Sequence, residues 1–236
     1  MAAGKSIIIT GGTGALGRSV ASLFLNKGMR VAIPVRPGTM RTEFPVELLG
    51  GGENIIFREA DLSSETDVTA FVSDAAARFG SVDIVVNAAG GYAGGEAIGD
   101  VSLATLERML TINLRTAFLM CSAVLPLMRG RKFGRIINIA AMPALSPAPL
   151  RGPYAIAKRG VITLTESIAE EVKGSGITAN AIAPSIILTP ANTASMPKAD
   201  TSRWVSPEEI AAIILFLCSD DARSLNGNVF KAYGGV

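Results

Sequence analysis

Short runs of consecutive apolar residues alternate along the whole chain with longer segments in which apolar residues recur every three or four positions. Runs of this kind, rich in Val and Ile and without polar alternation, predict strands that are buried on both faces of a parallel sheet. We predict strands at Ser6–Thr10, Arg30–Val35, Ile55–Glu59, Val82–Asn87, Arg135–Ile139, Thr178–Ala183 and Val229–Ala232.

Helical periodicity fills the segments between these runs. Leu16, Val20 and Phe24 fall on one face of a helix, and Gly28 follows as a cap. The segment "SPEE" at Ser206–Glu209 is a capping box with proline at the first helical position. The segment from Leu103 to Met128 holds one long helix or two, and its pattern leaves both open.

This alternation predicts an α/β protein with a single doubly wound Rossmann-type domain over residues 1–236. We expect a mostly parallel seven-stranded sheet with helices on both faces. The longest irregular segment, "LTPANTASMPKADTSRW" at 188–204, is predicted to be a substrate lid.

Composition excludes several classes of function. A net charge of +2 without basic runs argues against a nucleic-acid partner, and the apolar run Ile210–Cys218 is too short to span a bilayer. Histidine is absent, which removes His-based triads and metal sites, and we expect no metal. Cys121 and Cys218 stand alone in apolar segments and are interpreted as core residues. We therefore expect a cytoplasmic protein that acts on a small molecule.

A glycine-rich turn follows the first strand directly. Glycines between a strand and an amphipathic helix let backbone amides approach a pyrophosphate at the helix N-terminus. The predicted dinucleotide-binding residues of this turn are Gly11, Thr13, Gly14, Ala15, Leu16 and Gly17.

The end of the second strand bears on the choice of dinucleotide. NAD-binding proteins usually carry an acidic residue there for the ribose 2′-hydroxyl. This chain has Val35 followed by Arg36, and an arginine pairs well with a 2′-phosphate. The expected cofactor is NADP(H), although a solvated loop arginine is the alternative.

Tyr154 and Lys158 lie four residues apart and therefore share one helix face. An ammonium beside a phenol favours the phenolate and lowers the tyrosine pKa, so the pair is a candidate proton donor. Taken alone, such a pair is more often part of a helix surface than of a site.

With these motifs in order, the chain resembles the short-chain dehydrogenase/reductase family over nearly its whole length. Ala15 stands at the middle glycine of the family's T-G-x-x-x-G-x-G motif, and "NAAG" at Asn87–Gly90 is similar to the motif after the fourth strand. The segment "NAIAPSIILTP" resembles the family's N-x-x-x-P-G-x-x-x-T, with Ser185 in place of glycine. In "LNGNVFKAYGG", Tyr233 stands where an aspartate is common.

The resemblance implies residue roles. Tyr154 would be the general acid, Lys158 would lower its pKa and hold the nicotinamide ribose, and Asn113 would hold a water linked to the lysine. The further cofactor-binding residues that it implies are Asp61, Leu62, Asn87, Ala88, Ala89, Gly90, Pro184, Ile187 and Thr189. Members usually pair through their long helices, so a homodimer or homotetramer is expected.

One family residue is missing. Members usually carry a serine about thirteen residues before the tyrosine, but position 141 is alanine and Ala140 precedes it. Ser146, nearer to the tyrosine in sequence, is the candidate hydroxyl to replace it. A donor to a developing oxyanion contributes roughly 2–4 kcal/mol, so its loss disfavours ordinary ketone reduction.

A narrower resemblance leads to a substrate prediction. Dihydropteridine reductases lack the serine and reduce a conjugated quinonoid ring, and "AGGYAGGEA" and the 188–204 segment are similar to theirs. A flat ring would stack on an aromatic residue. The predicted substrate-binding residues are Tyr92, Ala141, Ser146, Met196 and Trp204.

Three functions remain open. The first is NADPH-dependent reduction of a quinonoid dihydropterin or similar ring without a catalytic serine. The second is general carbonyl or 3-oxoacyl reduction, with Ser146 or backbone amides in place of the serine. The third is a non-catalytic NADPH-binding protein, against which the joint presence of Asn113, Tyr154 and Lys158 argues.

Overall fold

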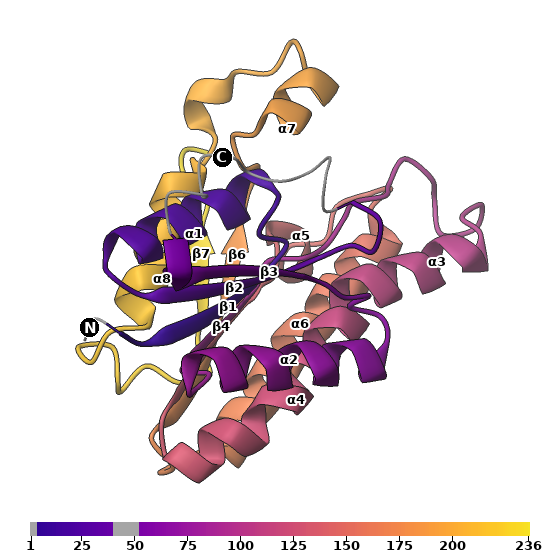
Figure 1. The fold of residues 1–236 in the computed structure, drawn as a ribbon. Coiled ribbons are helices and arrows are strands. Elements are labelled where there is room, and N and C mark those ends of the chain that lie inside the picture. Colours follow the sequence, from indigo (N-terminus) through magenta and orange to yellow (C-terminus); the bar gives the residue numbers. More distant parts are fainter. Residues whose placement is uncertain (1–3, 40–51) are drawn as a thin grey trace.

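A computed structural model describes residues 4–39 and 52–236 and contains one seven-stranded sheet (Figure 1). The strand order is β3-β2-β1-β4-β5-β6-β7, and every neighbouring pair is parallel, so the sheet is fully rather than mostly parallel. The strands are β1 (Ser6–Thr10), β2 (Arg30–Val35), β3 (Ile55–Glu59), β4 (Ile84–Asn87), β5 (Gly134–Ile139), β6 (Ile177–Pro184) and β7 (Val229–Ala232). The alternation of apolar runs therefore predicted all seven strands, four of them with the observed bounds.

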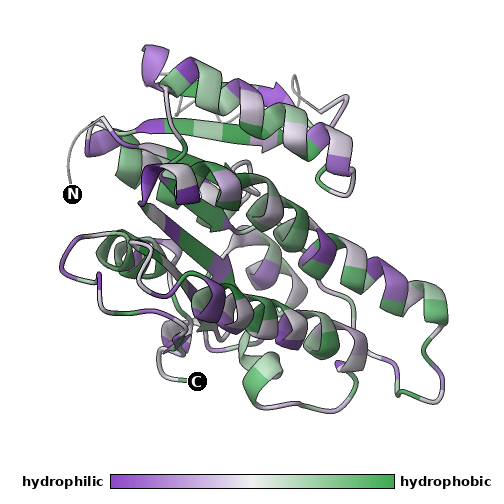
Figure 2. Cartoon of the chain, turned by 90° about the horizontal axis from the view of Figure 1, so that it is seen from below, coloured by the Kyte–Doolittle hydropathy of each residue, from purple (hydrophilic) through white to green (hydrophobic). Residues whose placement is uncertain are grey.

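Helices cover both faces of the sheet. They are α1 (Ala15–Asn26), α2 (Glu65–Phe79), α3 (Leu103–Leu110), α4 (Thr116–Arg131), α5 (Met142–Leu145), α6 (Gly152–Glu171), α7 (Pro190–Ser195) and α8 (Pro207–Leu217). Residues of α1 and α8 form one core cluster with the strands, and residues of α2, α4 and α6 form a second. A smaller third cluster includes Ala144 of α5 and Ile162 of α6. The central strands between these layers are mostly apolar (Figure 2).

The segment that the sequence left as one helix or two is one continuous helix. A π-helical turn at Thr111–Arg115 joins α3 to α4 without a break. By length and composition this helix, Leu103–Arg131, could cross a membrane. In the structure, Met120, Val124 and Met128 of α4 are fully buried against the sheet, so it is a core helix of this fold.

The chain reverses direction across the sheet between β1 and β4. From β1 the strands run outward to β3, and the chain then returns to place β4 on the other side of β1. In such sheets ligands bind beyond the carboxyl ends of the strands at this switch point. Here those ends lead to Gly11 after β1 and Ala88 after β4.

Candidate functional site

The glycine turn after β1 is closely packed against the end of β4. Gly11 has a φ of +68°, and a Cβ there would lie 2.8 Å from the backbone nitrogen of Ala89. A Cβ on Gly17 would fall on the carbonyl oxygen of Gly11. No side chain caps the N-terminus of α1 at Gly14, so the first amides of this helix face the turn without a side-chain acceptor. A helix start of this kind fits a dinucleotide pyrophosphate.

A cleft of about 480 Å³, which we call the dinucleotide cleft, continues from this turn along the ends of β2 and β3. Asp61 lies on its wall, and two hydrogen bonds from Ser63 lower the pKa of its carboxyl group. Arg36 also lines the cleft and is exposed. The lining residues are Gly11, Thr13, Gly14, Pro34, Val35, Arg36, Ala60, Asp61, Leu62, Ser63, Ala88, Ala89, Gly90, Thr111, Ile112 and Thr116.

The π-helical turn places Asn113 beside the loop after β4. The buried Asn113 amide accepts a hydrogen bond from Gly91 N at 3.2 Å and donates to Gly91 O at 3.0 Å. A Cβ on Gly90 would lie 2.5 Å from Asn113 Oδ1 and 3.4 Å from Lys158 Nζ. π-helical turns are rare and often occur at functional sites. This one brings Asn113, Gly90 and Lys158 together.

Lys158 and Tyr154 lie one turn apart on α6 beside the end of β5. Lys158 is buried, its Nζ donates to Ile139 O at 2.7 Å, and burial lowers the pKa of its ammonium to about 8. Burial raises the pKa of Tyr154 to about 12. The predicted lowering of the Tyr154 pKa by Lys158 is therefore wrong for the protein alone, because burial and Tyr92 raise this pKa and only Arg151 opposes them.

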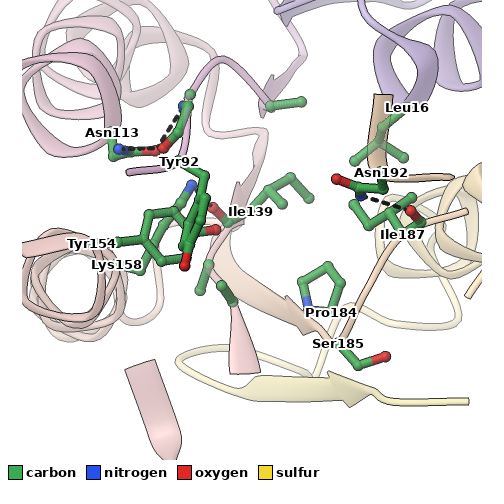
Figure 3. A pocket seen from close by; sticks show the side chains of 15 residues that line it. Leu16, Tyr92, Asn113, Ile139, Tyr154, Lys158, Pro184, Ser185, Ile187 and Asn192 are labelled. Atoms are coloured by element: carbon green, nitrogen blue, oxygen red, sulfur yellow. Dashed lines mark hydrogen bonds between the residues drawn. The ribbon is translucent and has the colours of Figure 1, made fainter. Parts of the chain in front are cut away.

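Tyr92, from the loop after Gly91, packs edge-on against Tyr154. The ring centroids are 5.1 Å apart and the ring planes make an angle of 81°. The rings cross on one side of the cavity, with Lys158 behind them pointing toward Ile139, and Pro184, Ser185, Ile187 and Asn192 face them (Figure 3). Tyr92 nevertheless keeps 58% of its surface exposed.

Two cavities meet at Tyr154. The first, the inner cavity, has a volume of about 250 Å³ and is lined by Leu16, Ala88, Gly90, Gly91, Tyr92, Asn113, Ile139, Ala140, Ala141, Tyr154, Lys158, Pro184, Ser185, Ile187 and Asn192. The second, the outer cavity, has a volume of about 410 Å³ and is lined by Tyr92, Ala141, Met142, Pro143, Arg151, Tyr154, Ser185, Ile186, Asn192, Ser195 and Met196. The first shares Ala88 and Gly90 with the dinucleotide cleft. The second shares no lining residue with that cleft.

Most of the predicted site residues lie on the walls of the cleft and the two cavities, but six do not. Asn87 turns into the core and donates to Asn138 Oδ1 at 2.8 Å. Thr189 caps α7 by accepting from Asn192 N at 3.2 Å. Ser146 is exposed and Trp204 is buried, and neither lines the two cavities. Ala15 and Gly17 belong to the glycine turn through their backbone at the start of α1.

Other lining residues were missed by the sequence reasoning. Asn192 and Ser195 fall inside the predicted lid, which was the available signal for them. Arg151 and Met142 lie on either side of the loop after β5 and come together only when that loop folds back, so no sequence pattern marks them.

Comparisons with known proteins show the family. Residues 5–200 match the short chain dehydrogenase family. The chain is 29% identical over 254 residues to D-beta-hydroxybutyrate dehydrogenase of Rhizobium meliloti (strain 1021), covering 98% of each chain. Its fold matches ElxO with NADP bound at a TM-score of 0.91 and 27% identity over 98% of each chain. It matches levodione reductase at a TM-score of 0.91 and 31% identity, over 100% of this chain and 98% of the other.

None of these three relatives is a dihydropteridine reductase, and the predicted resemblance to that group gains no support from them. The family motifs that the sequence carries, the parallel sheet and the matches over nearly the full length agree. The chain belongs to the short-chain dehydrogenase/reductase family and is an NAD(P)-dependent oxidoreductase.

Proposed function

We propose that the protein is an NADPH-dependent reductase of carbonyl compounds in which Tyr154 donates the proton. The observation that carries this is the position of Tyr154 on the walls of both cavities, of which the inner one shares Ala88 and Gly90 with the dinucleotide cleft. With its pKa raised to about 12, the phenol carries at neutral pH the proton that a general acid has to donate. The names of the relatives, which include a hydroxybutyrate dehydrogenase and a levodione reductase, also favour carbonyl chemistry over pterin chemistry.

The cleft walls support NADP(H) as the cofactor. The chain has no carboxylate at the end of β2, where Val35 is followed by Arg36, and Arg36 lines the cleft. Glu59 on the neighbouring β3 uses its Oε1 atom to accept a hydrogen bond from Gly38 N at 3.0 Å. An arginine directly after β2, where NAD-binding proteins usually carry an acidic residue, favours a cofactor with a 2′-phosphate.

The residues of this chain would divide the work as follows. The glycine turn would hold the pyrophosphate of the cofactor, whose nicotinamide would supply the hydride. The buried ammonium of Lys158 lies between Gly90 and Ile139, where it would help to orient the bound cofactor. Tyr154 delivers its phenolic proton to the carbonyl oxygen, and the ammonium of Lys158 stabilises the phenolate left behind.

The site has no serine to help hold the developing oxyanion. Ala140 and Ala141 present methyl groups, Ser185 donates to Tyr233 O at 2.8 Å, and Ser195 donates to Asn192 O at 2.9 Å. The hydroxyl of Tyr92 has no hydrogen-bond partner among the described residues. The Tyr92 ring lines both cavities beside Tyr154, and we propose that this ring contacts the substrate.

A second candidate function is reduction of a flat conjugated ring such as a quinonoid dihydropterin. Two observations favour it: Ala141 leaves no hydroxyl for an alkoxide, and the exposed Tyr92 ring offers a stacking surface. Reduction of such a ring needs no full alkoxide, so the missing serine costs less.

A turnover panel separates the two candidates. NADPH and NADH oxidation is measured with ketones, oxo esters, β-keto thioesters and chemically generated quinonoid dihydropterin, for the wild type, Tyr154→Phe and Ala141→Ser. Carbonyl reduction predicts that NADPH is preferred, that Tyr154→Phe removes turnover, and that Ala141→Ser raises ketone turnover about tenfold or more. Fast pterin turnover with inert ketones, unchanged by Ala141→Ser, identifies the ring reductase. NADPH binding without turnover of any compound points to a non-catalytic protein.

A further inference from the structure

The outer cavity beside Tyr154 contains a positively charged side chain, Arg151, to which the proposed reduction assigns no role. Its volume of about 410 Å³ falls within the range of about 300–1,000 Å³ common for small-molecule sites. It shares Tyr92, Ala141, Tyr154, Ser185 and Asn192 with the inner cavity, so a molecule held there would reach the reacting phenol.

One cation stands in an otherwise uncharged wall. Met142, Pro143, Ile186 and Met196 make one side of the outer cavity apolar, and Arg151 is the only charged residue that lines it among the described residues. No Asp or Glu of the described chain lines either cavity. Arg151 forms no hydrogen bond or ion pair with another described side chain, and it is half-buried. A half-buried guanidinium without an acceptor lacks the partner that such groups normally have.

Arg151 is also close to the reacting group. It is the N-cap of α6, three residues before Tyr154, and both residues line the outer cavity. Its charge acts on the Tyr154 phenol, where it opposes the effect of burial. In a substrate that reaches both residues, the anionic group at Arg151 would therefore be only a few bonds away from the carbonyl oxygen that contacts Tyr154.

We propose that Arg151 binds an anionic group of the substrate, and that the substrates are small carbonyl compounds with a carboxylate or a similar anion close to the carbonyl. The guanidinium forms paired hydrogen bonds with the two oxygens of a carboxylate, which fixes the orientation of the carbonyl toward Tyr154. The remainder of the substrate packs against Met142, Ile186 and Met196. This proposal rests on the proposed carbonyl reduction for its reaction, but the anion site is defined by the cavity alone.

The test compares oxo acids with their methyl esters, which keep the carbonyl and lose the charge. Steady-state kinetics with NADPH are measured for the wild type, Arg151→Met, Arg151→Lys and Arg159→Met. Arg159 is exposed on the same helix and lines neither cavity, so its variant removes an equal charge without touching the site.

We expect the wild type to prefer the acid, and Arg151→Met to lose about 10–100-fold in kcat/KM for the acid through a higher KM. The ester should change little, Arg151→Lys should restore part of the loss, and Arg159→Met should match the wild type. An equal loss for acid and ester, or no preference for the acid in the wild type, would overturn the proposal while carbonyl reduction stands.

A binding measurement keeps the proposal testable if no carbonyl compound is reduced. Calorimetric titration of the same oxo acids into the protein saturated with NADPH should give heat for the wild type and Arg159→Met, and none for Arg151→Met. Binding with this pattern but without turnover would reject the proposed reaction and retain the anion site. Absence of binding to the wild type would reject the anion site itself.

Discussion

Two ionisable side chains on one helix have their pKa values moved in opposite senses by the same cause. Burial disfavours the charged form of each group, so it lowers the pKa of Lys158 and raises that of Tyr154. Burial therefore shifts the protonation equilibrium of each group toward its neutral form, compared with the same group in water. The phenol of Tyr154 is therefore protonated at neutral pH.

The contact of Tyr92 with Tyr154 gives a first prediction. Tyr92 covers the Tyr154 ring and is the second cause, after burial, of the raised Tyr154 pKa. Tyr92→Ala should therefore move the Tyr154 pKa down from about 12 toward its ordinary value of 10. The chain has three tyrosines, so ultraviolet titration of phenolate absorption in Tyr92→Ala and Tyr92→Ala/Tyr154→Phe isolates Tyr154. An unchanged titration would show that Tyr92 does not shield this phenol.

The buried Lys158 predicts a pH-dependent stability. At neutral pH its ammonium is protonated in the folded and unfolded protein, and the folded state carries the full cost of burying it. Above a pH of about 8 the folded protein loses this proton while the unfolded chain keeps it up to about 10.5, so the free energy of unfolding rises with pH. Lys158→Met lacks this gain.

The stability advantage of Lys158→Met over the wild type should accordingly shrink by about 2 kcal/mol between about pH 7 and about pH 9.5. Urea unfolding at several pH values measures it. Lys173→Met, which removes an exposed ammonium at the end of α6, is the control and should keep a constant difference. A constant difference for Lys158→Met as well would mean that this lysine is not desolvated as the structure indicates.

The glycine turn shows how one element sets the position of another. The turn can pass between β1 and α1 only because Gly17 has no Cβ to meet the backbone of Gly11 and Gly12. Gly17→Ala should destabilise the protein by about 1–3 kcal/mol, because backbone on both sides must move, and it should weaken NADPH binding. Gly130→Ala in the exposed part of α4, where a Cβ meets nothing within 4 Å, should instead stabilise by about 0.5–1 kcal/mol.

Urea denaturation and NADPH fluorescence titration measure both effects for the two variants. Equal stability and equal NADPH affinity in Gly17→Ala and the wild type would refute the view that this turn is held by backbone contact.

The elements themselves were largely predictable, since buried parallel strands are continuous apolar runs and β1, β2, β3 and β7 have their predicted bounds. The π-helical turn at Thr111–Arg115 was not, because it depends on the bonds of Asn113 to Gly91 in a distant loop. The side-chain direction of Asn87 was missed for the same kind of reason. The sequence predicts where a strand ends, but not toward which face its last side chain points. For Asn87, the hydrogen bond to Asn138 on the neighbouring strand fixes this direction.

At the scale of the whole molecule, the longest helix, Leu103–Arg131, exposes more apolar surface than packing within one chain explains. Only 33% of the most apolar window in Leu103–Arg131 is buried, although its mean hydropathy is 1.5. Phe118 on α4 and Ile156 on α6 remain 53% and 50% exposed on the helix layer that contains both. Exposed apolar groups gathered on one helix layer are typical of a protein–protein interface. We therefore keep the prediction that the chain forms a homodimer or homotetramer, and place its interface on α4 and α6.

This prediction has a control within the same chain. Phe216 on α8 is 51% exposed but lies on the opposite layer of the sheet. Light scattering after size-exclusion chromatography should give an oligomer for the wild type and for Phe216→Glu, and a shift toward monomer for Phe118→Glu and Ile156→Glu, because a charge buried in an apolar interface has no partner. Circular dichroism checks that each variant is folded. If the wild type is a monomer, or if Phe216→Glu alone dissociates it, the interface is not on α4 and α6. If the predicted pattern appears, the apolar surface of the long helix is explained by a second copy of the chain.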